Sequence, residues 1–335
     1  MRTLLLGGTW FLGRAVAKQA LEAGHEVTAF NRGRSAPDLP GTVPVHGDRT
    51  SAQDLARLAE HGPWDLVIDT SSSELAPAQV LAGARALEPV TAHYVYVSTV
   101  NAYTGWPNTP LTESSPTYDV PADAGRDYGR GDGPTAHYGQ QKAGSEHAVR
   151  AAYRYDRTTL LRPGVILGPG EYVGRLPWWL SRCERGGDIL LPGPPERTVQ
   201  PIDVRDVAAF ALTAPTGAFN LAAPKSRDTM DGFLTACLTA TGSSGRPVPV
   251  PDAVLTQHGV REWTELPLWR TAGGAWAVDT TSAQTAGLVC RPLADTVTDT
   301  WSWMQDGPGP VKHPRWDQHG IAPEKEAEIL AAAQV

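Results

Sequence analysis

Short apolar runs alternate with longer segments of helical periodicity through the first half of the chain. The apolar runs predict strands over 4–6, 26–30, 43–46, 66–68, 94–97 and 159–161. Apolar residues spaced three and four apart predict helices over 12–21, 51–61, 77–87 and 136–153. Strands that alternate with helices of this length are typical of βαβ units. We therefore expect an α/β fold built on a doubly wound parallel sheet.

The second half of the chain has a different pattern. It predicts a helix over 203–212 and a seventh strand over 218–221, and then mostly helices, over 229–241, 252–259, 292–303 and 323–333. A chain of 335 residues also exceeds the usual size of a single domain. We predict a Rossmann domain over 1–165, to which 202–222 returns. Residues 166–201 and 223–335 would form a smaller C-terminal substrate-binding lobe.

Two segments between the predicted elements are loops. Residues 104–136 are rich in Pro, Gly, Asp, Ser and Thr and have little periodicity. A loop of this length inside a compact domain is usually functional or mobile. Residues 307–319 also have the composition of a loop.

A glycine-rich turn joins the first strand to the first helix. Gly7 and Gly8 follow the apolar run 4–6, and Gly13 lies in the first turn of the helix. The N-terminus of a helix offers free N–H groups and positive potential, which suits a phosphate. The same turn could also join strand and helix without any ligand, because glycine-rich turns are common.

Tyr138 and Lys142 are four residues apart in a predicted helix, so they share one face. A nearby ammonium group favours the phenolate and lowers the pKa of a tyrosine, which makes it a usable acid or base. Thr99 follows the strand 94–97, at the edge of a parallel sheet where ligands bind. The plainer alternatives are a tyrosine that packs on a lysine stem and a hydroxyl that binds local backbone.

Together these motifs resemble the extended short-chain dehydrogenases/reductases of the NAD-dependent epimerase/dehydratase family. The glycine turn, Thr99, the Tyr138-x-x-x-Lys142 pair and the segments 162–170 and 200–207 occur in that family's order. The resemblance runs from residue 3 to about residue 305. The segments 7–13, 30–33 and 47–49 are similar to a branch that includes bacterial oxidoreductases and some plastid RNA-binding relatives.

The resemblance implies roles for the matching residues. Tyr138 would be the general acid/base, Lys142 would lower its pKa and hold the nicotinamide ribose, and Thr99 would hydrogen-bond the reacting oxygen. Besides Tyr138 and Lys142, the implied cofactor site comprises Gly7, Gly8, Thr9, Trp10, Phe11, Leu12, Gly13, Asn31, Arg32, Arg34, Asp48, Arg49, Thr70, Ser71, Ser98, Pro163, Gly164 and Val165.

Two positions depart from the pattern. Trp10 stands where the family turn usually has a glycine, so either its side chain points away from the pyrophosphate or the cofactor binds differently. Sites that prefer NAD place an acid at the end of the second strand. This chain has Asn31 there, followed by Arg32 and Arg34, and such groups suit a 2′-phosphate. We therefore favour NADP(H) over NAD(H), although these arginines could simply belong to a solvated loop.

The residues after Thr99 bear on the reaction. Dehydratases of the family carry an Asp-Glu pair there, whereas this chain has Val100 and Asn101. We expect an NADPH-dependent reductase that transfers hydride to a carbonyl of a small or sugar-like metabolite. The alternatives are a sugar-nucleotide epimerase with tightly bound NAD and a non-catalytic nucleotide- or RNA-binding relative.

Candidate substrate residues are Asn101, Arg175, Trp178 and Trp179. Tryptophans could stack on a flat or sugar-like ligand, or could pack in the core of the lobe. Arg175 could hold a phosphate or carboxylate. The histidines and cysteines show no metal-binding spacing, so we expect no metal.

Composition limits the possible partners and the compartment. The net charge of −7 argues against a general nucleic-acid binder, although it allows a local basic groove. No apolar run reaches ~18 residues, so no membrane span is indicated. Three separated cysteines suit a reducing compartment. We expect a cytoplasmic protein. The resemblance implies a homodimer formed through helices near 76–88 and 136–153.

Overall fold

The computed structural model describes residues 1–34, 36–70, 74–307 and 316–333. The chain divides into two compact units. Unit 1 comprises Met1–Gly164, Val204–Ala222 and Val278–Val289, and unit 2 comprises Val165–Asp203, Ala223–Ala277 and Cys290–Val335. The sequence-based division placed 278–289 in the C-terminal lobe, and this part was wrong. Asp279 belongs to unit 1, because its N–H donates to Leu111 O at 2.8 Å and its carbonyl accepts from Asn220 Nδ2 at 3.1 Å.

Unit 1 contains a seven-stranded sheet in which every pairing is parallel. Its strands, in spatial order, are β11 (Gly217–Leu221), β6 (Thr158–Pro163), β5 (Thr91–Val97), β4 (Trp64–Asp69), β1 (Arg2–Leu6), β2 (Glu26–Asn31) and β3 (Val43–His46). Leu4, Leu5 and Leu6 are fully buried, as expected for strands covered on both faces. The predicted doubly wound parallel sheet is confirmed.

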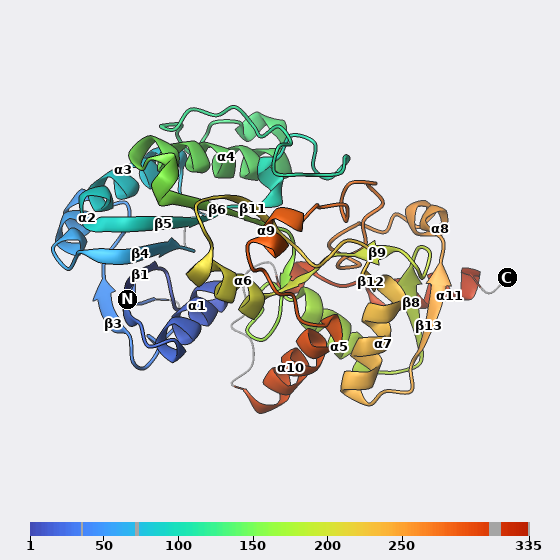
Figure 1. Ribbon diagram of the computed structural model, residues 1–335. Coiled ribbons are helices and arrows are strands. Elements are labelled where there is room, and N and C mark those ends of the chain that lie inside the picture. The colour runs from blue at the N-terminus through green and yellow to red at the C-terminus, as the bar shows by residue number, and fades with distance from the viewer. Residues whose placement is uncertain (35, 71–73, 308–315, 334–335) are drawn as a thin grey trace. The chain divides into compact units, whose positions relative to one another are not determined.

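Helices cover both faces of this sheet (Figure 1). On one face α1 (Phe11–Glu22) packs against α6 (Val204–Thr213). On the other face α3 (Pro77–Leu87) packs against both α2 (Ala52–Ala59) and α4 (Pro134–Ala152). Local sequence explains where these helices begin: the Ser51 hydroxyl accepts from Asp54 N at 3.2 Å, and α3 and α4 each start with proline.

The long loop between β5 and α4 is anchored along its length. Short 3₁₀ turns occur at η2 (Val100–Ala102) and η3 (Arg130–Asp132), and isolated bridges join Tyr103 to Thr117 and Leu111 to Val278. His147 of α4 bonds the Val120 carbonyl at 2.7 Å. A small helix, α9 (Thr281–Thr285), also belongs to unit 1.

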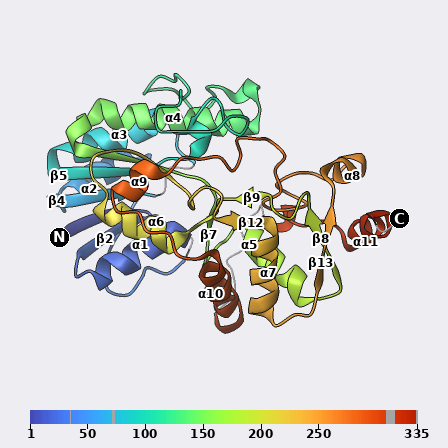
Figure 2. The same cartoon turned by 45° about the vertical axis from the view of Figure 1, so that its right-hand side comes forward.

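Unit 2 packs helices and short strand pairs around its own apolar core. Figures 1 and 2 show α5 (Arg175–Glu184), α7 (Met230–Thr241) and α10 (Leu293–Asp306) packed together, and the smaller helices are α8 (Asp252–Gln257) and α11 (Pro323–Ala333). The strand pairs are β7 (Ile166–Leu167) with β10 (Ile202–Asp203), β9 (Thr198–Val199) with β12 (Asp228–Thr229), and β8 (Asp188–Pro192) with β13 (Arg246–Val250). The sequence analysis missed β13, because Pro247 and Pro249 hide the strand pattern.

No helix in the described parts of the chain is both long and apolar enough to cross a membrane.

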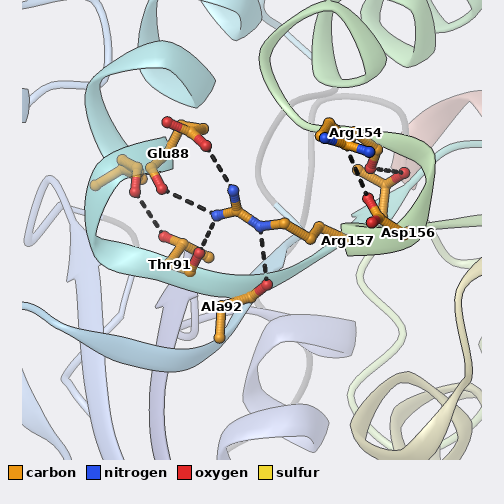
Figure 3. Close-up of polar contacts among 8 residues, drawn as sticks. Glu88, Thr91, Ala92, Arg154, Asp156 and Arg157 are labelled. Carbon is orange, nitrogen blue, oxygen red and sulfur yellow. Dashed lines mark hydrogen bonds and ion pairs between the residues drawn. The ribbon is translucent and has the colours of Figure 1, made fainter.

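One arginine joins the start of β5 to the turn before β6 (Figure 3). Arg157 ends a 3₁₀ turn, η4 (Tyr155–Arg157). Its guanidinium lies 2.5 Å from Glu88 Oε1, donates to the carbonyls of Glu88 at 3.1 Å and Ala92 at 3.2 Å, and also donates to the Thr91 carbonyl. One side chain therefore satisfies several acceptors at the start of β5.

Replacing Arg157 by alanine should lower the free energy of unfolding by about 1–3 kcal/mol, because charged hydrogen bonds to backbone carbonyls are lost. Urea denaturation measures this change. Arg154→Ala is the matched control, since Arg154 is 85% exposed and makes one ion pair, with Asp156 (Figure 3). Equal stability of the two variants would contradict the assigned role of Arg157.

Candidate active site

The glycine turn of unit 1 leaves no room for side chains. Gly7 and Gly8 have φ angles of 118° and 105°, which only glycine adopts readily. A Cβ on Gly13 would lie 2.7 Å from Gly8 N and 2.9 Å from Thr70 Oγ1. The first turn of α1 therefore packs directly on the strand–helix turn. This cradle fits a dinucleotide pyrophosphate at the N-terminus of α1.

Trp10 and Phe11 give the start of α1 an unusual form. Trp10 is the N-cap residue and is half-buried, and its indole has a donor but no acceptor, so it cannot cap the helix as Ser or Asp would. Phe11 has a φ of 29°, outside the range preferred by bulky residues. Backbone strain of this kind is concentrated at functional sites.

A carboxylate that the sequence analysis did not consider lies at the carboxyl ends of β2 and β3. Asn31 and His46 are register partners there. Asp38 accepts a hydrogen bond from Asn31 Nδ2 at 2.8 Å and lies 2.8 Å from His46 Nε2. Burial raises the pKa of Asp38, but the hydrogen bonds to Asn31 and His46, together with the charge of His46, hold the pKa below its ordinary value.

The predicted cofactor residues next to this carboxylate are mostly exposed. Arg32 and Arg34 are exposed. The pKa of Asp48 is lowered mainly by hydrogen bonds from the Thr50 N–H and hydroxyl, and the charges of Arg32 and Arg34 lower it further. Asp48 Oδ1 accepts both bonds, at 2.8 and 2.7 Å. Asp48 therefore helps to fix the turn that follows β3.

Arg49 forms a buried ion pair with Asp69. Its two terminal nitrogens bind the two oxygens of Asp69 at 2.7 Å each, and the Tyr94 hydroxyl donates to Asp69 Oδ2 at 2.9 Å. Arg49 is 8% exposed and Asp69 is fully buried. Arg49 therefore forms a buried ion pair inside unit 1, and its contact with a cofactor stays a prediction. Thr70 follows this pair and donates to Leu6 O at 3.2 Å, whereas Ser71 lies outside the described residues.

The end of β5 carries Ser98 and Thr99, both nearly buried. Thr99 Oγ1 accepts from the Asn101 N–H at 3.2 Å and donates to Asn101 Oδ1 at 3.3 Å. Ser98 Oγ is buried and has no hydrogen-bond partner within the described parts of the protein. Buried hydroxyls are normally satisfied, so this one suits a polar group of a bound molecule.

Lys142 extends from α4 to the same end of β5. Its Nζ donates to Val97 O at 2.6 Å and lies 4.5 Å from the centre of the Tyr96 ring. Lys142 is 4% exposed, whereas Tyr138 is 36% exposed. Burial lowers the pKa of Lys142, and its interaction with Tyr138 opposes that shift. The ammonium is thus fixed behind a tyrosine whose ring reaches solvent.

A glycine sets the distance between α4 and the segment after Thr99. A Cβ on Gly139 would lie 2.1 Å from Asn101 O and 3.0 Å from the Tyr118 ring. Gly144, further along α4, faces Pro77 and Val120, each 2.7 Å from its hypothetical Cβ. This close approach brings the α4 backbone, which also carries Tyr138, against the segment that follows Thr99.

A buried polar chain behind these residues was missed from the sequence. Arg162 of β6 binds Glu146 of α4 through Nε at 2.9 Å and Nη2 at 2.5 Å, and its Nη1 donates to the Tyr103 hydroxyl at 2.8 Å. Tyr103 in turn donates to Asn220 Oδ1 of β11 at 2.8 Å. The available signal was spacing, since Glu146 follows Lys142 by four residues on one helix face.

The remaining predicted residues lie elsewhere in the two units. Gly164 follows Pro163 at the end of β6, and its N–H donates to Leu221 O at 2.9 Å. Val165 is the first residue of unit 2. Trp179 is fully buried in the core of unit 2 and donates to Pro267 O at 2.7 Å, so its predicted contact with substrate is corrected to a packing role.

Two arginines of unit 2 stack on one tryptophan. The guanidinium carbons of Arg175 and Arg270 lie 4.9 and 4.5 Å from the centre of the Trp263 ring. Trp178 is half-buried and packs edge-on against Trp179 at 4.6 Å. Burial lowers the pKa of Arg270, Glu262 opposes this, and Arg175 lowers it further. These residues form a cluster of two guanidinium groups on an aromatic surface, in which Arg175 also lies 4.0 Å from the buried Glu171 carboxylate.

No group of three or more His, Cys, Asp or Glu side chains among the described residues could hold a metal ion.

The family profile for the NAD dependent epimerase/dehydratase family matches residues 3–224. The chain belongs to this family, as the resemblance implied. Its members bind a nicotinamide cofactor, and the glycine cradle, the α1 N-terminus and the unsatisfied Ser98 hydroxyl fit that group.

Individual relatives are distant. The chain is 25% identical to the chloroplast stem-loop binding protein of 41 kDa b from Arabidopsis thaliana, over 72% of this chain and 63% of that protein. It is 28% identical to 2-alkyl-3-oxoalkanoate reductase from Stenotrophomonas maltophilia, over 65% of this chain and 68% of that protein. The chain thus matches about two thirds of the length of each relative.

A solved structure supports the fold. The Bordetella bronchiseptica enzyme WbmG, in complex with NAD and UDP, superposes with a TM-score of 0.68 at 19% identity. The superposition covers 93% of this chain and 97% of that one. At this identity the likeness supports a shared architecture.

Replacing Gly139 by alanine should push α4 away from Asn101 and lower the free energy of unfolding by about 1–3 kcal/mol, the usual size of an overpacking effect. Thermal unfolding measures it. Gly131→Ala is the control, because nothing lies within 4 Å of its hypothetical Cβ. If both variants unfold at the same temperature, the close contact does not constrain α4.

Proposed function

We propose that this chain is an NADPH-dependent reductase that delivers hydride to a carbonyl of a small or sugar-like metabolite. The observation that carries the proposal is the location of Tyr138 and Lys142 on α4 next to the Thr99 segment, with Val100 and Asn101 in the positions of a dehydratase acid pair. The named activity of the Stenotrophomonas relative, reduction of a 3-oxo acid, supports the same reaction type.

The protein's own residues would handle the substrate oxygen and its proton. Thr99, already held by Asn101, positions that oxygen, and Tyr138 donates a proton to it. Lys142 stabilises the resulting phenolate, because its buried ammonium interacts with Tyr138. A nicotinamide cofactor bound on the glycine cradle supplies the hydride.

The substrate residues that remain candidates are Asn101, Arg175 and Trp178. The Arg175–Trp263–Arg270 stack supports a substrate that carries a carboxylate or phosphate. The exposed Arg32 and Arg34 support NADP(H) over NAD(H). The expected homodimer and cytoplasmic location stay predictions.

An RNA-binding function is the second candidate, because the plant relative is named a stem-loop binding protein. The net charge of −7 and the tyrosine–lysine pair count against it. A salt-dependent affinity for a stem-loop RNA, in protein that turns over no carbonyl substrate, would favour this candidate.

An epimerase would instead release tightly bound NAD when the purified protein is denatured.

Tyr138→Phe tests the reductase directly. NADPH oxidation is followed at 340 nm with a panel of 3-oxo acids and keto sugars. The variant should lose at least about a hundredfold in rate, because general acid catalysis contributes that much or more. It should still bind NADPH. Tyr155→Phe is the matched control, since Tyr155 is 72% exposed. A Tyr138→Phe enzyme that keeps its rate would rule out the proposed role.

A further inference from the structure

The loop after β2 brings a carboxylate to the place where Rossmann proteins distinguish NAD from NADP. The Gly7 N–H donates to Phe30 O at 2.9 Å, so the end of β2 adjoins the glycine cradle. In this fold an acid at the end of β2 accepts the ribose hydroxyls of NAD, and an arginine nearby accommodates the 2′-phosphate of NADP. Asn31 occupies the acid's usual position.

Asp38 supplies the missing negative charge. Its two oxygens bridge Asn31 and His46, which end the neighbouring strands β2 and β3. The loop is held in place by further contacts: the Gly33 N–H donates to Asn31 Oδ1 at 2.7 Å, and the His46 ring lies 3.3 Å from a hypothetical Cβ on Gly33. The Asp38 side chain is 23% exposed, so its charge lies near solvent.

Charges of both signs therefore meet in one shallow hollow. Arg34 lines it together with Pro37, Asp38 and His46. The arginine attracts a 2′-phosphate, whereas the charge of the Asp38 carboxylate, whose two oxygens are held by Asn31 and His46, repels a phosphate. Asp48 also interacts with Arg32 and Arg34 and binds Thr50 through Oδ1, so it is a second carboxylate near these arginines.

We infer that Asp38 is a specificity-determining residue, which opposes the 2′-phosphate and keeps the preference for NADPH over NADH small. The inference rests on the proposed nicotinamide-dependent function. Asp38 lies seven positions beyond the end of β2, and its hydrogen bond with Asn31 holds its negative charge beside that strand end.

The experiment measures dissociation constants of NADPH and NADH by fluorescence titration of the whole protein. Asp38→Asn should tighten NADPH binding roughly three- to tenfold, the size expected for like charges ~6 Å apart in a solvated site. NADH affinity should stay the same or weaken. The gain should shrink at high salt, because screening weakens exposed charge interactions. Arg34→Gln should move the ratio the opposite way.

Controls separate charge from loop distortion. Asp156→Asn removes a carboxylate that is 68% exposed and lies outside the hollow, so it should leave the ratio unchanged. Asp38→Ser removes the same charge with a different shape and should reproduce the shift. An unchanged NADPH-to-NADH ratio in both Asp38 variants would overturn the inference. Failure of the unmodified protein to bind either dinucleotide would instead overturn the proposed function.

Discussion

The close approach of α4 to the segment after β5 is the constraint on which the site depends. Gly139 allows it, since any larger residue would place its Cβ 2.1 Å from Asn101 O. One turn further along α4, Lys142 reaches Val97 O on the same strand end. Two contacts from one helix thus hold α4 against the end of β5 and the segment that follows it. The long loop also holds α4 through His147.

Buried charge accompanies this arrangement. Lys142, Glu146 and Arg162 are each less than 5% exposed. Burying ions is costly unless they are paired and hydrogen-bonded, and here Arg162 is satisfied by both Glu146 and Tyr103. The hydrogen-bonded side chains that connect α4 with β6 and β11 therefore hold α4 in one position. Apolar side chains alone would fill the same space but would define the position of α4 less uniquely.

The sequence predicted the parallel sheet, its main helices and the tyrosine–lysine pair, because periodicity and spacing are local signals. It could not predict contacts between distant positions. Arg162 meets Tyr103 across 59 residues, and Arg49 meets Asp69 across 20. Asp38 was overlooked because its role depends on how the loop folds back to Asn31. Trp179 was misassigned because an aromatic residue has the same pattern in a core and in a ligand site.

A crystal structure of the protein with NADPH tests the account most directly. We expect the pyrophosphate to lie on Gly7, Gly8 and the N-terminus of α1, with the nicotinamide ribose within hydrogen-bonding distance of Tyr138 and Lys142. Ser98 Oγ should gain a polar partner from the cofactor or from a water bound to it. A dinucleotide bound elsewhere, or one whose nicotinamide lies away from Tyr138 and Thr99, would contradict the account.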